Sequence, residues 1–330
     1  AAIGPEHLPE EAARRLADKC AEKERLRVRL EALRDHYKQD LAQKSVLGMT
    51  LDTFIGLTAQ QTLRVDRVFI DEAPYAPLAK VLPVLSLHRP IAMLGDHFQL
   101  PPICECENDV IVRAYWAKPA IFLEDAFRCG EDWGTLHGLE KPEFRLTQTR
   151  TLKRSYRFGQ SLASLLDRHI YDNKGLVGLR ADDTCIRCID CEPRQRADRN
   201  RRENDAEADA IVAWIRRWWA QQLSDLPTIA ILTPYKNQAR LIRKRLKSAF
   251  QDSPLYDHID VLNTHKAQGR EWDWVLFSVS DTGNLVGNDP YFTNSRHRVG
   301  RKVLNTTISR AKQHLWIFLD AGYWRERTPS

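Results

Sequence analysis

Residues 67–102 constrain the fold of this chain more than any other stretch. They contain two short apolar runs, residues 68–70 and 91–94, and each run is followed by acidic or amide side chains. A buried strand of an open parallel sheet is nearly all apolar, and its chemistry lies just past its carboxyl end. Residues 75–87 between the runs suit a crossover helix. The stretch therefore predicts two neighbouring buried strands of an α/β sheet.

The polar residues at these strand ends are candidates for chemistry. Asp71 and Glu72 follow the first run, and Gln99 lies just beyond the second. One carboxylate could hold Mg²⁺, the other could take a proton from water, and the amide could sense a phosphate. An Asp-Glu pair at a strand end could also cap a helix, so the pair alone is a weak signal.

Length, charge and cysteine content bound the class of protein. A chain of 330 residues favours two domains. No run of eighteen apolar residues occurs, so no membrane span is expected. Seven cysteines, an odd number, favour a reducing cytosol, and hence a cytoplasmic location, over a disulfide framework. The net charge is −5 over residues 1–143 and +11 over residues 144–330. The basic half predicts a polyanionic partner, or alternatively a solvated surface.

Three regions are predicted. Residues 1–45 form a helical arm with a narrow apolar stripe between charges: Leu26, Leu30, Leu33, Tyr37 and Leu41. This helix could be an arm, half of a helical hairpin or a partner-binding helix, or it could pack on its own domain. Residues 46–143 form a first α/β domain that opens with a buried strand at residues 46–50. Residues 144–330 form a second domain.

Alternating strands and helices predict a parallel sheet for the second domain. Helices are expected at residues 159–170, 204–222, 238–250 and 303–311, and strands at residues 185–191, 228–232, 259–262, 274–279 and 315–319. Residues 192–203 and 281–301 are predicted polar loops. Cys185, Cys188 and Cys191 fit a strand, although three close thiols could instead ligate zinc or an iron–sulfur cluster.

Five further segments follow the Asp71-Glu72 pair in a fixed order: residues 95–101, 155–157, 233–235, 268–271 and 309–312. That series resembles superfamily 1 helicases, and most closely the 5′-to-3′ branch that includes the nonsense-mediated-decay helicase. The resemblance covers about residues 45–320. It implies a RecA-like P-loop NTPase fold, with residues 46–143 as part of the first domain and residues 144–330 as a complete second domain.

The resemblance implies an ATP-dependent helicase or single-strand translocase that uses Mg²⁺. Asp71 would hold Mg²⁺ through water, and Glu72 would activate the hydrolytic water. Gln99 would couple the γ-phosphate to domain movement, and Arg157 and Arg310 would reach the γ-phosphate. Arg310 could alternatively be a surface charge at a helix end.

The remaining candidates would bind nucleotide or a single strand, with DNA favoured over RNA. The expected nucleotide-binding residues are Tyr156, Gly269 and Glu271. The expected nucleic-acid-binding residues are Thr50, Thr233, Pro234, Tyr235, Thr264 and His265. The threonines could instead cap strand ends, and the Lys and Arg side chains of residues 240–247 could be a solvated helix face.

The family's phosphate-binding loop, Gly-x₄-Gly-Lys-Ser/Thr, does not occur in the sequence. We therefore expect a carboxyl-terminal fragment that is inactive alone and depends on an upstream part of the same polypeptide. The alternatives are an ATPase-inactive nucleic-acid-binding or scaffold protein, and a translocase subunit of a nuclease or defence system.

Overall fold

A computed structural model describes residues 10–58, 64–103, 150–191, 202–221, 226–282 and 299–327. Contacts divide the chain into two units. The first comprises Ala1–Ile70 and Leu78–Met93, and the second comprises Asp71–Pro77 and Leu94–Ser330. The predicted boundary between residues 143 and 144 lies outside the described residues and stays a prediction, and so do most of the two polar loops.

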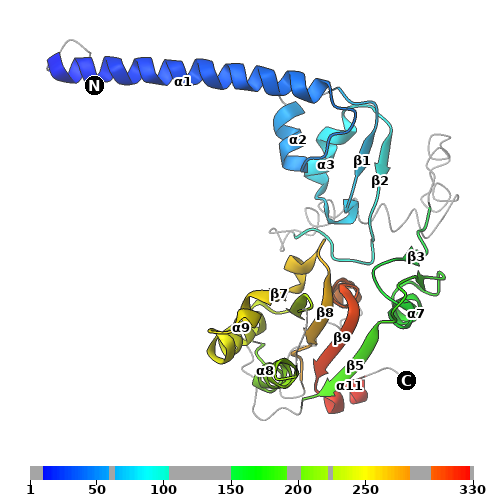
Figure 1. The fold of residues 1–330 in the computed structure, drawn as a ribbon. Coiled ribbons are helices and arrows are strands. Elements are labelled where there is room, and N and C mark those ends of the chain that lie inside the picture. Colours follow the sequence, from blue (N-terminus) through cyan, green and yellow to red (C-terminus); the bar gives the residue numbers. More distant parts are fainter. Residues whose placement is uncertain are drawn as a thin grey trace. The chain divides into compact units, whose positions relative to one another are not determined.

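The first unit begins with the predicted long helix, α1 (Glu10–Ala42) (Figure 1). Its side chains are mostly charged and exposed, and neighbouring turns form ion pairs such as Arg27–Glu31 at 3.3 Å. Leu26, Leu30 and Leu33 of the apolar stripe are also exposed. This part of the stripe therefore does not pack back on its own domain.

Two parallel strands follow, β1 (Val68–Ile70) and β2 (Ile91–Met93), with α3 (Leu78–Leu85) between them. Val68 is in register with Ile91, and Ile70 with Met93. The predicted pair of neighbouring strands with a crossover helix is confirmed. The prediction that the first strand is buried is wrong for one face, because Phe69 is 71% exposed.

The strand predicted at residues 46–50 is wrong. Val46 is 87% exposed, and the segment pairs with no strand among the described residues. Thr50 instead precedes helix α2 (Leu51–Thr58), where its Oγ1 accepts a hydrogen bond from the Thr53 amide at 3.2 Å. That bond satisfies a backbone donor at the helix start, as a helix cap does.

The second unit is built on a five-stranded parallel sheet. Its strands are β5 (Cys185–Asp190), β6 (Ile229–Thr233), β7 (Ile259–Asn263), β8 (Trp272–Ser278) and β9 (Ala311–Leu319). The order across the sheet is β5-β9-β8-β6-β7. The expected parallel α/β domain is confirmed. A short parallel pair, β3 (Arg154–Ser155) with β4 (Val177–Gly178), was not predicted, because two residues carry no periodic signal.

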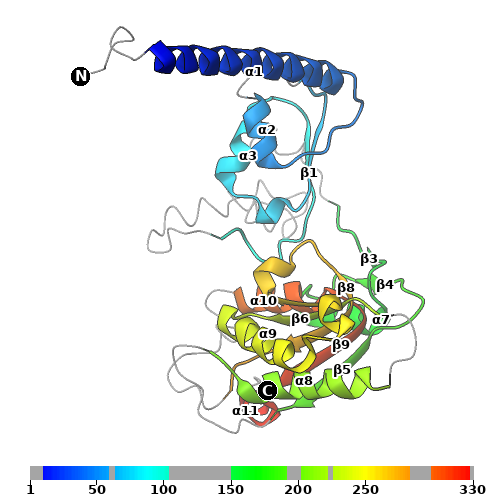
Figure 2. The ribbon, with the colours of Figure 1, turned by 60° about the vertical axis from the view of Figure 1, so that its left-hand side comes forward.

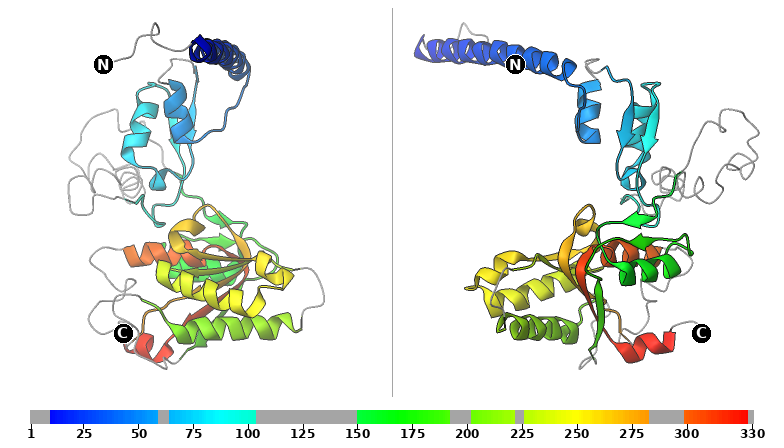
Figure 3. Two further views of the ribbon diagram at one scale, coloured as in Figure 1. Left: turned by 90° about the vertical axis from the view of Figure 1, so that its left-hand side faces the viewer. Right: turned by 45° about the vertical axis from the view of Figure 1, so that its right-hand side comes forward.

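Helices cover both faces of this sheet. Helices α8 (Asp205–Trp219) and α9 (Lys236–Phe250) lie on one face (Figure 2), and α7 (Gln160–His169) and α10 (Val299–Ile308) lie on the other (Figure 3). The described residues end with α11 (Ala321–Arg327). The short 3₁₀ turns η2 (Ala73–Tyr75), η5 (Pro254–His258) and η6 (Thr264–Ala267) complete the described elements.

Strand β6 shows why both faces must be covered. Ile229 and Ile231 pack in the core under α8 and α9, whereas Ala230 and Leu232 pack in the core with α7. Successive side chains of a strand point to opposite faces, so a strand with no polar residue before its end needs a helix on each side.

The described residues offer two negative observations. None of their helices is long and apolar enough to cross a membrane. No group of three His, Cys, Asp or Glu side chains among them could hold a metal ion. Cys185, Cys188 and Cys191 carry free thiols, and the first two lie in β5, the predicted strand.

Leu276→Ala tests the double-sided core. Leu276 is fully buried on central strand β8, so the substitution should lower the free energy of unfolding by about 2–5 kcal/mol. Urea unfolding measures this loss. The control is Leu179→Ala at an exposed site, which should change stability by about 0.5 kcal/mol or less. Equal losses in the two variants would contradict this packing.

Candidate functional site

The loop that follows β1 and the loop that follows β2 contact each other just past the carboxyl ends of the two strands. The Ala73 amide donates to the Leu94 carbonyl oxygen at 2.9 Å. Gly95 has a φ of +149°, and a Cβ at this position would lie 2.3 Å from Cδ of Pro74. Only glycine permits this backbone conformation and this close approach. The two loops that carry Asp71, Glu72 and Gln99 are therefore held together in the second unit.

Asp71 and Glu72 stand in a special backbone conformation. Glu72 has a φ of +51°, the left-handed region that non-glycine residues rarely adopt, and Oδ1 of Asp71 accepts its amide at 2.9 Å. Glu72 precedes turn η2 without a side-chain capping bond, so its side chain does not cap that turn. The Asp71 carboxylate is exposed. An exposed carboxylate suits an Mg²⁺ ion held through water, which takes oxygen ligands and retains several waters.

Arg310 is the most buried charged residue of the candidate set. It follows α10, is 1% exposed, and donates to the carbonyl oxygens of Thr306 at 2.9 Å and Arg270 at 3.3 Å. A third bond runs to Oε1 of Gln99. Burial, with the nearby charge of Arg157, lowers the pKa of Arg310 to about 10. The group is therefore still charged near neutral pH, and Arg310 is not a surface charge at a helix end.

Gln99 is oriented by a carboxylate that sequence reasoning missed. Oδ2 of Asp96 accepts from Nε2 of Gln99 at 3.2 Å, from the Tyr171 hydroxyl at 2.6 Å and from Nδ2 of Asn305 at 3.2 Å. Because its amide nitrogen is bound to Asp96, Gln99 turns its oxygen toward Arg310. Burial, then the charge of Asp96, raises the pKa of Tyr171, so its hydroxyl stays a donor.

The loop that holds Gln99 is also bound directly to α10. Asn305 donates to the Phe98 carbonyl oxygen at 3.1 Å, and the Leu100 amide donates to Oγ1 of Thr306 at 3.1 Å. Asn305 and Thr306 are fully buried. Three consecutive polar residues within a buried helix, Asn305, Thr306 and Thr307, were the available signal, because buried polar groups need partners.

Glu271 lies between two cations. Its Oε2 accepts from Nε of Arg157 at 2.7 Å, and its Oε1 is 3.0 Å from Nζ of Lys312. The hydrogen bond from Lys312, with that from Arg157, holds the pKa of Glu271 below its usual range. Arg157 also donates to the Ser309 carbonyl oxygen at 3.2 Å. The structure thus brings Arg157, Glu271 and Arg310 together, as predicted, and adds Lys312.

Tyr156 and Gly269 border this cluster in the sequence. Tyr156 is 76% exposed, and its ring is open to a stacking ligand. Gly269 has a φ of +71° with open space where a Cβ would point. Their roles as nucleotide-binding residues stay predictions.

Two of the three threonines predicted to bind nucleic acid, Thr233 and Thr264, are buried at the carboxyl ends of β6 and β7. Oγ1 of Thr233 lies 3.1 Å from Oγ of Ser280, and Oγ1 of Thr264 lies 2.9 Å from Oγ1 of Thr307. Thr264 also donates to the Thr233 carbonyl oxygen at 3.3 Å. These hydroxyls link the ends of neighbouring strands, which fits the strand-end alternative. Thr50 belongs to the first unit and is exposed.

Tyr235 and His265 differ from these threonines. The Tyr235 hydroxyl donates to Asp281 at 2.7 Å and accepts from Arg202 at 2.9 Å, and the Arg202 guanidinium lies over its ring at 5.0 Å. Nδ1 of His265 is buried without a hydrogen-bond partner, and burial, then the charge of Lys236, lowers its pKa. Pro234, between Thr233 and Tyr235, is half-buried. Arg202, which the sequence did not point to, contacts this segment through its bonds to Tyr235 and Asp281.

The fully buried carboxyl of Glu207 holds the segment after β8 in place, next to Thr233. Glu207 of α8 accepts from Oγ of Ser278 at 2.6 Å, from the Ser280 amide at 2.9 Å and from Nδ2 of Asn204 at 3.1 Å. Asn204 caps α8, with its side chain accepting from the Glu207 amide at 3.1 Å. Burial raises the pKa of Glu207 to about 8. The network fixes the segment around Ser280, and the Ser280 hydroxyl is hydrogen-bonded to Thr233.

Glu207→Gln tests this buried carboxyl. Its folded pKa of about 8 exceeds the ordinary 4.5, so the folded state holds the proton more tightly than the unfolded state. Stability from this residue is therefore lost as pH rises between these values, by up to about 1.4 kcal/mol per pH unit. Glu207→Gln should remove that slope, as measured by urea unfolding at several pH values. Exposed Glu326→Gln is the control, and an unchanged slope in Glu207→Gln would contradict the assignment.

The candidate residues come from two kinds of strand end. Asp71, Glu72 and Gln99 lie past the carboxyl ends of β1 and β2, whereas Glu271 and Arg310 immediately precede the amino ends of β8 and β9. A family model described as "AAA domain" (AAA_12) matches residues 139–321, more than half of the chain. The chain belongs to this family.

Several curated proteins are similar in sequence. The 3′-5′ exoribonuclease HELZ2 of Mus musculus is 24% identical over 322 residues, covering 92% of this chain and 10% of the relative. DNA polymerase alpha-associated DNA helicase A of Schizosaccharomyces pombe is 25% identical over 269 residues, covering 78% and 38%. The DNA replication ATP-dependent helicase/nuclease dna2 of the same yeast is 26% identical over 294 residues, covering 77% and 18%.

The chain spans well under half the length of each of these relatives. The resemblance to superfamily 1 helicases is confirmed, and the chain carries a helicase-like domain.

Proposed function

We propose that this chain forms the carboxyl-terminal part of the motor of an ATP-dependent helicase or single-strand translocase. The observation that supports it best is the buried Arg310, which Gln99 holds beside the Arg157–Glu271 pair. A guanidinium fixed in a water-poor site stabilises phosphate charge far more than one in water, and it needs no reorganisation during reaction. The motor activity belongs to the whole protein.

The residues of this chain fit distinct tasks in ATP hydrolysis. ATP with Mg²⁺ supplies the bond to be cleaved when it is bound. Asp71 would hold the metal through water, and Glu72 would orient and deprotonate the attacking water. Arg157 and Arg310 would stabilise charge on the γ-phosphate. Each offers a planar fork of donors that is charged throughout the physiological range.

Gln99 fits the coupling role because its amide is already shared between two partners. Its nitrogen donates to Asp96 and its oxygen accepts from Arg310. When Arg310 turns to a phosphate, Gln99 loses this partner. The loop that carries Gln99 is bound to α10 through Asn305 and Thr306, so a change at the phosphate would reach that helix.

Glu271 is proposed to bind the ribose and Tyr156 to stack on the base. In the present arrangement Glu271 holds Arg157 and Lys312. Nucleotide would therefore exchange one of these ion pairs for a ribose hydroxyl. Because Arg157 is the partner with a phosphate role, this exchange would release it at the moment of binding.

The sequence of this chain contains no Gly-x₄-Gly-Lys-Ser/Thr loop, so we infer that these 330 residues alone do not turn over ATP. An ATPase-inactive scaffold is less favoured, because the side chains at five catalytic positions can all perform the roles proposed for them: Asp71, Glu72, Gln99, Arg157 and Arg310. A translocase subunit of a nuclease or defence system differs by failing to separate strands. A strand-displacement assay distinguishes it.

The proposed partner is single-stranded nucleic acid, with DNA favoured over RNA. The names of the relatives include both an exoribonuclease and DNA helicases, so competition between DNA and RNA strands of equal sequence decides this preference. A cytoplasmic location is proposed because the cysteines of the described residues are all free thiols.

Arg310→Ala and the milder Arg310→Lys test the proposal in the full-length protein. Loss of the fork should lower nucleic-acid-stimulated ATP turnover by about 10³-fold or more, while nucleotide binding is largely retained. A steady-state phosphate-release assay measures turnover. The matched control is Arg245→Ala, an exposed arginine of α9, which should retain turnover. Unchanged turnover in both Arg310 variants would remove this arginine from the mechanism.

A further inference from the structure

Helix α9 carries a dense row of positive charge. Its sequence contains no Asp or Glu, and five of its cations are exposed: Lys236, Arg240, Arg243, Lys244 and Lys247. At 3.6 residues per turn these five fall within a sector of about 100°. We call these five residues the α9 stripe. It extends over about 16 Å at 1.5 Å per residue.

The α9 stripe lacks carboxylate partners, unlike the opposite side of the same helix. Within the part of the chain that the structure describes, none of the five forms an ion pair; Arg240 donates to Asn237 at 2.9 Å, and Arg243 to the Val261 carbonyl oxygen at 2.9 Å. Asp260 on the adjacent strand β7 is already paired, because it forms an ion pair with Arg270 at 2.9 Å.

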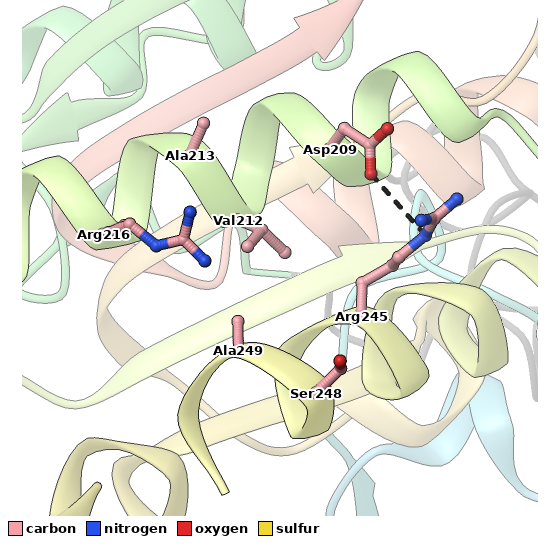
Figure 4. Close-up of a pocket in the computed structure, with 7 residues that line it drawn as sticks. All are labelled: Asp209, Val212, Ala213, Arg216, Arg245, Ser248 and Ala249. Carbon is pink, nitrogen blue, oxygen red and sulfur yellow. Dashed lines mark ion pairs between the residues drawn. The ribbon is translucent and has the colours of Figure 1, made fainter.

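Arg245 on the opposite side is neutralised by α8. It lies 2.8 Å from Asp205 and 3.6 Å from Asp209. Figure 4 shows Arg245 and Asp209 at the rim of a groove of about 340 Å³ between α8 and α9, with Arg216 on its far side. Helix α9 therefore has one side that is paired and one side where positive charge is left without countercharge.

The position of the α9 stripe connects it to the candidate nucleic-acid segment. The bond from Arg243 to Val261 places the stripe along β7, one of the two edge strands of the sheet as described. Its first member, Lys236, comes directly after Thr233, Pro234 and Tyr235. The stripe thus continues from that segment along the edge of the domain.

We propose that the α9 stripe binds the phosphate backbone of the single strand beyond residues 233–235. This inference rests on the proposed function. The cations recur at spacings of three and four residues, about 5–6 Å apart, which suits a regularly charged backbone.

The test uses the triple variant Arg240→Gln, Lys244→Gln and Lys247→Gln in the 330-residue chain. Arg243 is kept because it holds Val261. The probe is a fluorescent single-stranded DNA of mixed sequence, and affinity is measured over a salt series. Each phosphate contact contributes about 0.7 to the slope of log K against log salt for single strands. The variant should therefore lose about 2 from that slope.

The matched control is Arg216→Gln, Arg217→Gln and Arg245→Gln, which removes equal charge from α8 and from the paired side of α9. It should keep the wild-type slope, and melting curves check that both variants fold. Equal losses in the two variants, or none in the first, would overturn the inference while leaving the proposed function standing. A loss seen only with duplex DNA would also overturn it. If the wild-type chain binds no single strand, nucleic-acid binding by this chain fails together with the inference.

Discussion

The burial of the Arg310 guanidinium is the constraint on which the rest of the site depends. An unpaired buried charge costs several kcal/mol or more, so Arg310 requires oxygen partners around it. Two are carbonyl oxygens, from Thr306 one turn earlier and from Arg270, and the third is Gln99. Gln99 lies 211 residues away in the sequence, much farther than Arg270 at 40 residues. Satisfying Arg310 therefore fixes the loop after β2 against the end of α10.

The surrounding polar network follows from that requirement. Asp96 orients Gln99 and is itself held by Tyr171 and Asn305. Arg157, the second cation of the site, is held by Glu271, which also binds Lys312. Gln99 and Glu271 are side-chain partners that a bound nucleotide could replace, whereas the carbonyl oxygens of Thr306, Arg270 and Ser309 belong to the backbone. Both arginines are thus paired without a ligand, and each has one side-chain partner that can exchange.

Patterns of one residue type along a short segment were enough to predict much of the fold. The five strands of the main sheet and helices α7, α8, α9 and α10 were predicted, because buried parallel strands are apolar runs between amphipathic helices, as Ile229–Thr233 is. The strand predicted at residues 46–50 was wrong because an apolar run becomes a strand only where a neighbouring strand pairs with it. The predicted burial of Phe69 was wrong for a related reason, because burial depends on which elements cover that face of the strand.

The candidate site was predicted in its residue types but not in its connections. Gln99, Arg157, Glu271 and Arg310 were found from an ordered motif series. Asp96 was not predicted because its partners Tyr171 and Asn305 are 75 and 209 residues away, and no local pattern reports such contacts.

A double-mutant cycle with Gln99→Ala and Arg310→Met tests the contact between Gln99 and Arg310 most directly, with urea unfolding followed by tryptophan fluorescence. The losses should fall short of additivity by about 1–3 kcal/mol, whereas additivity within about 0.5 kcal/mol would contradict the contact.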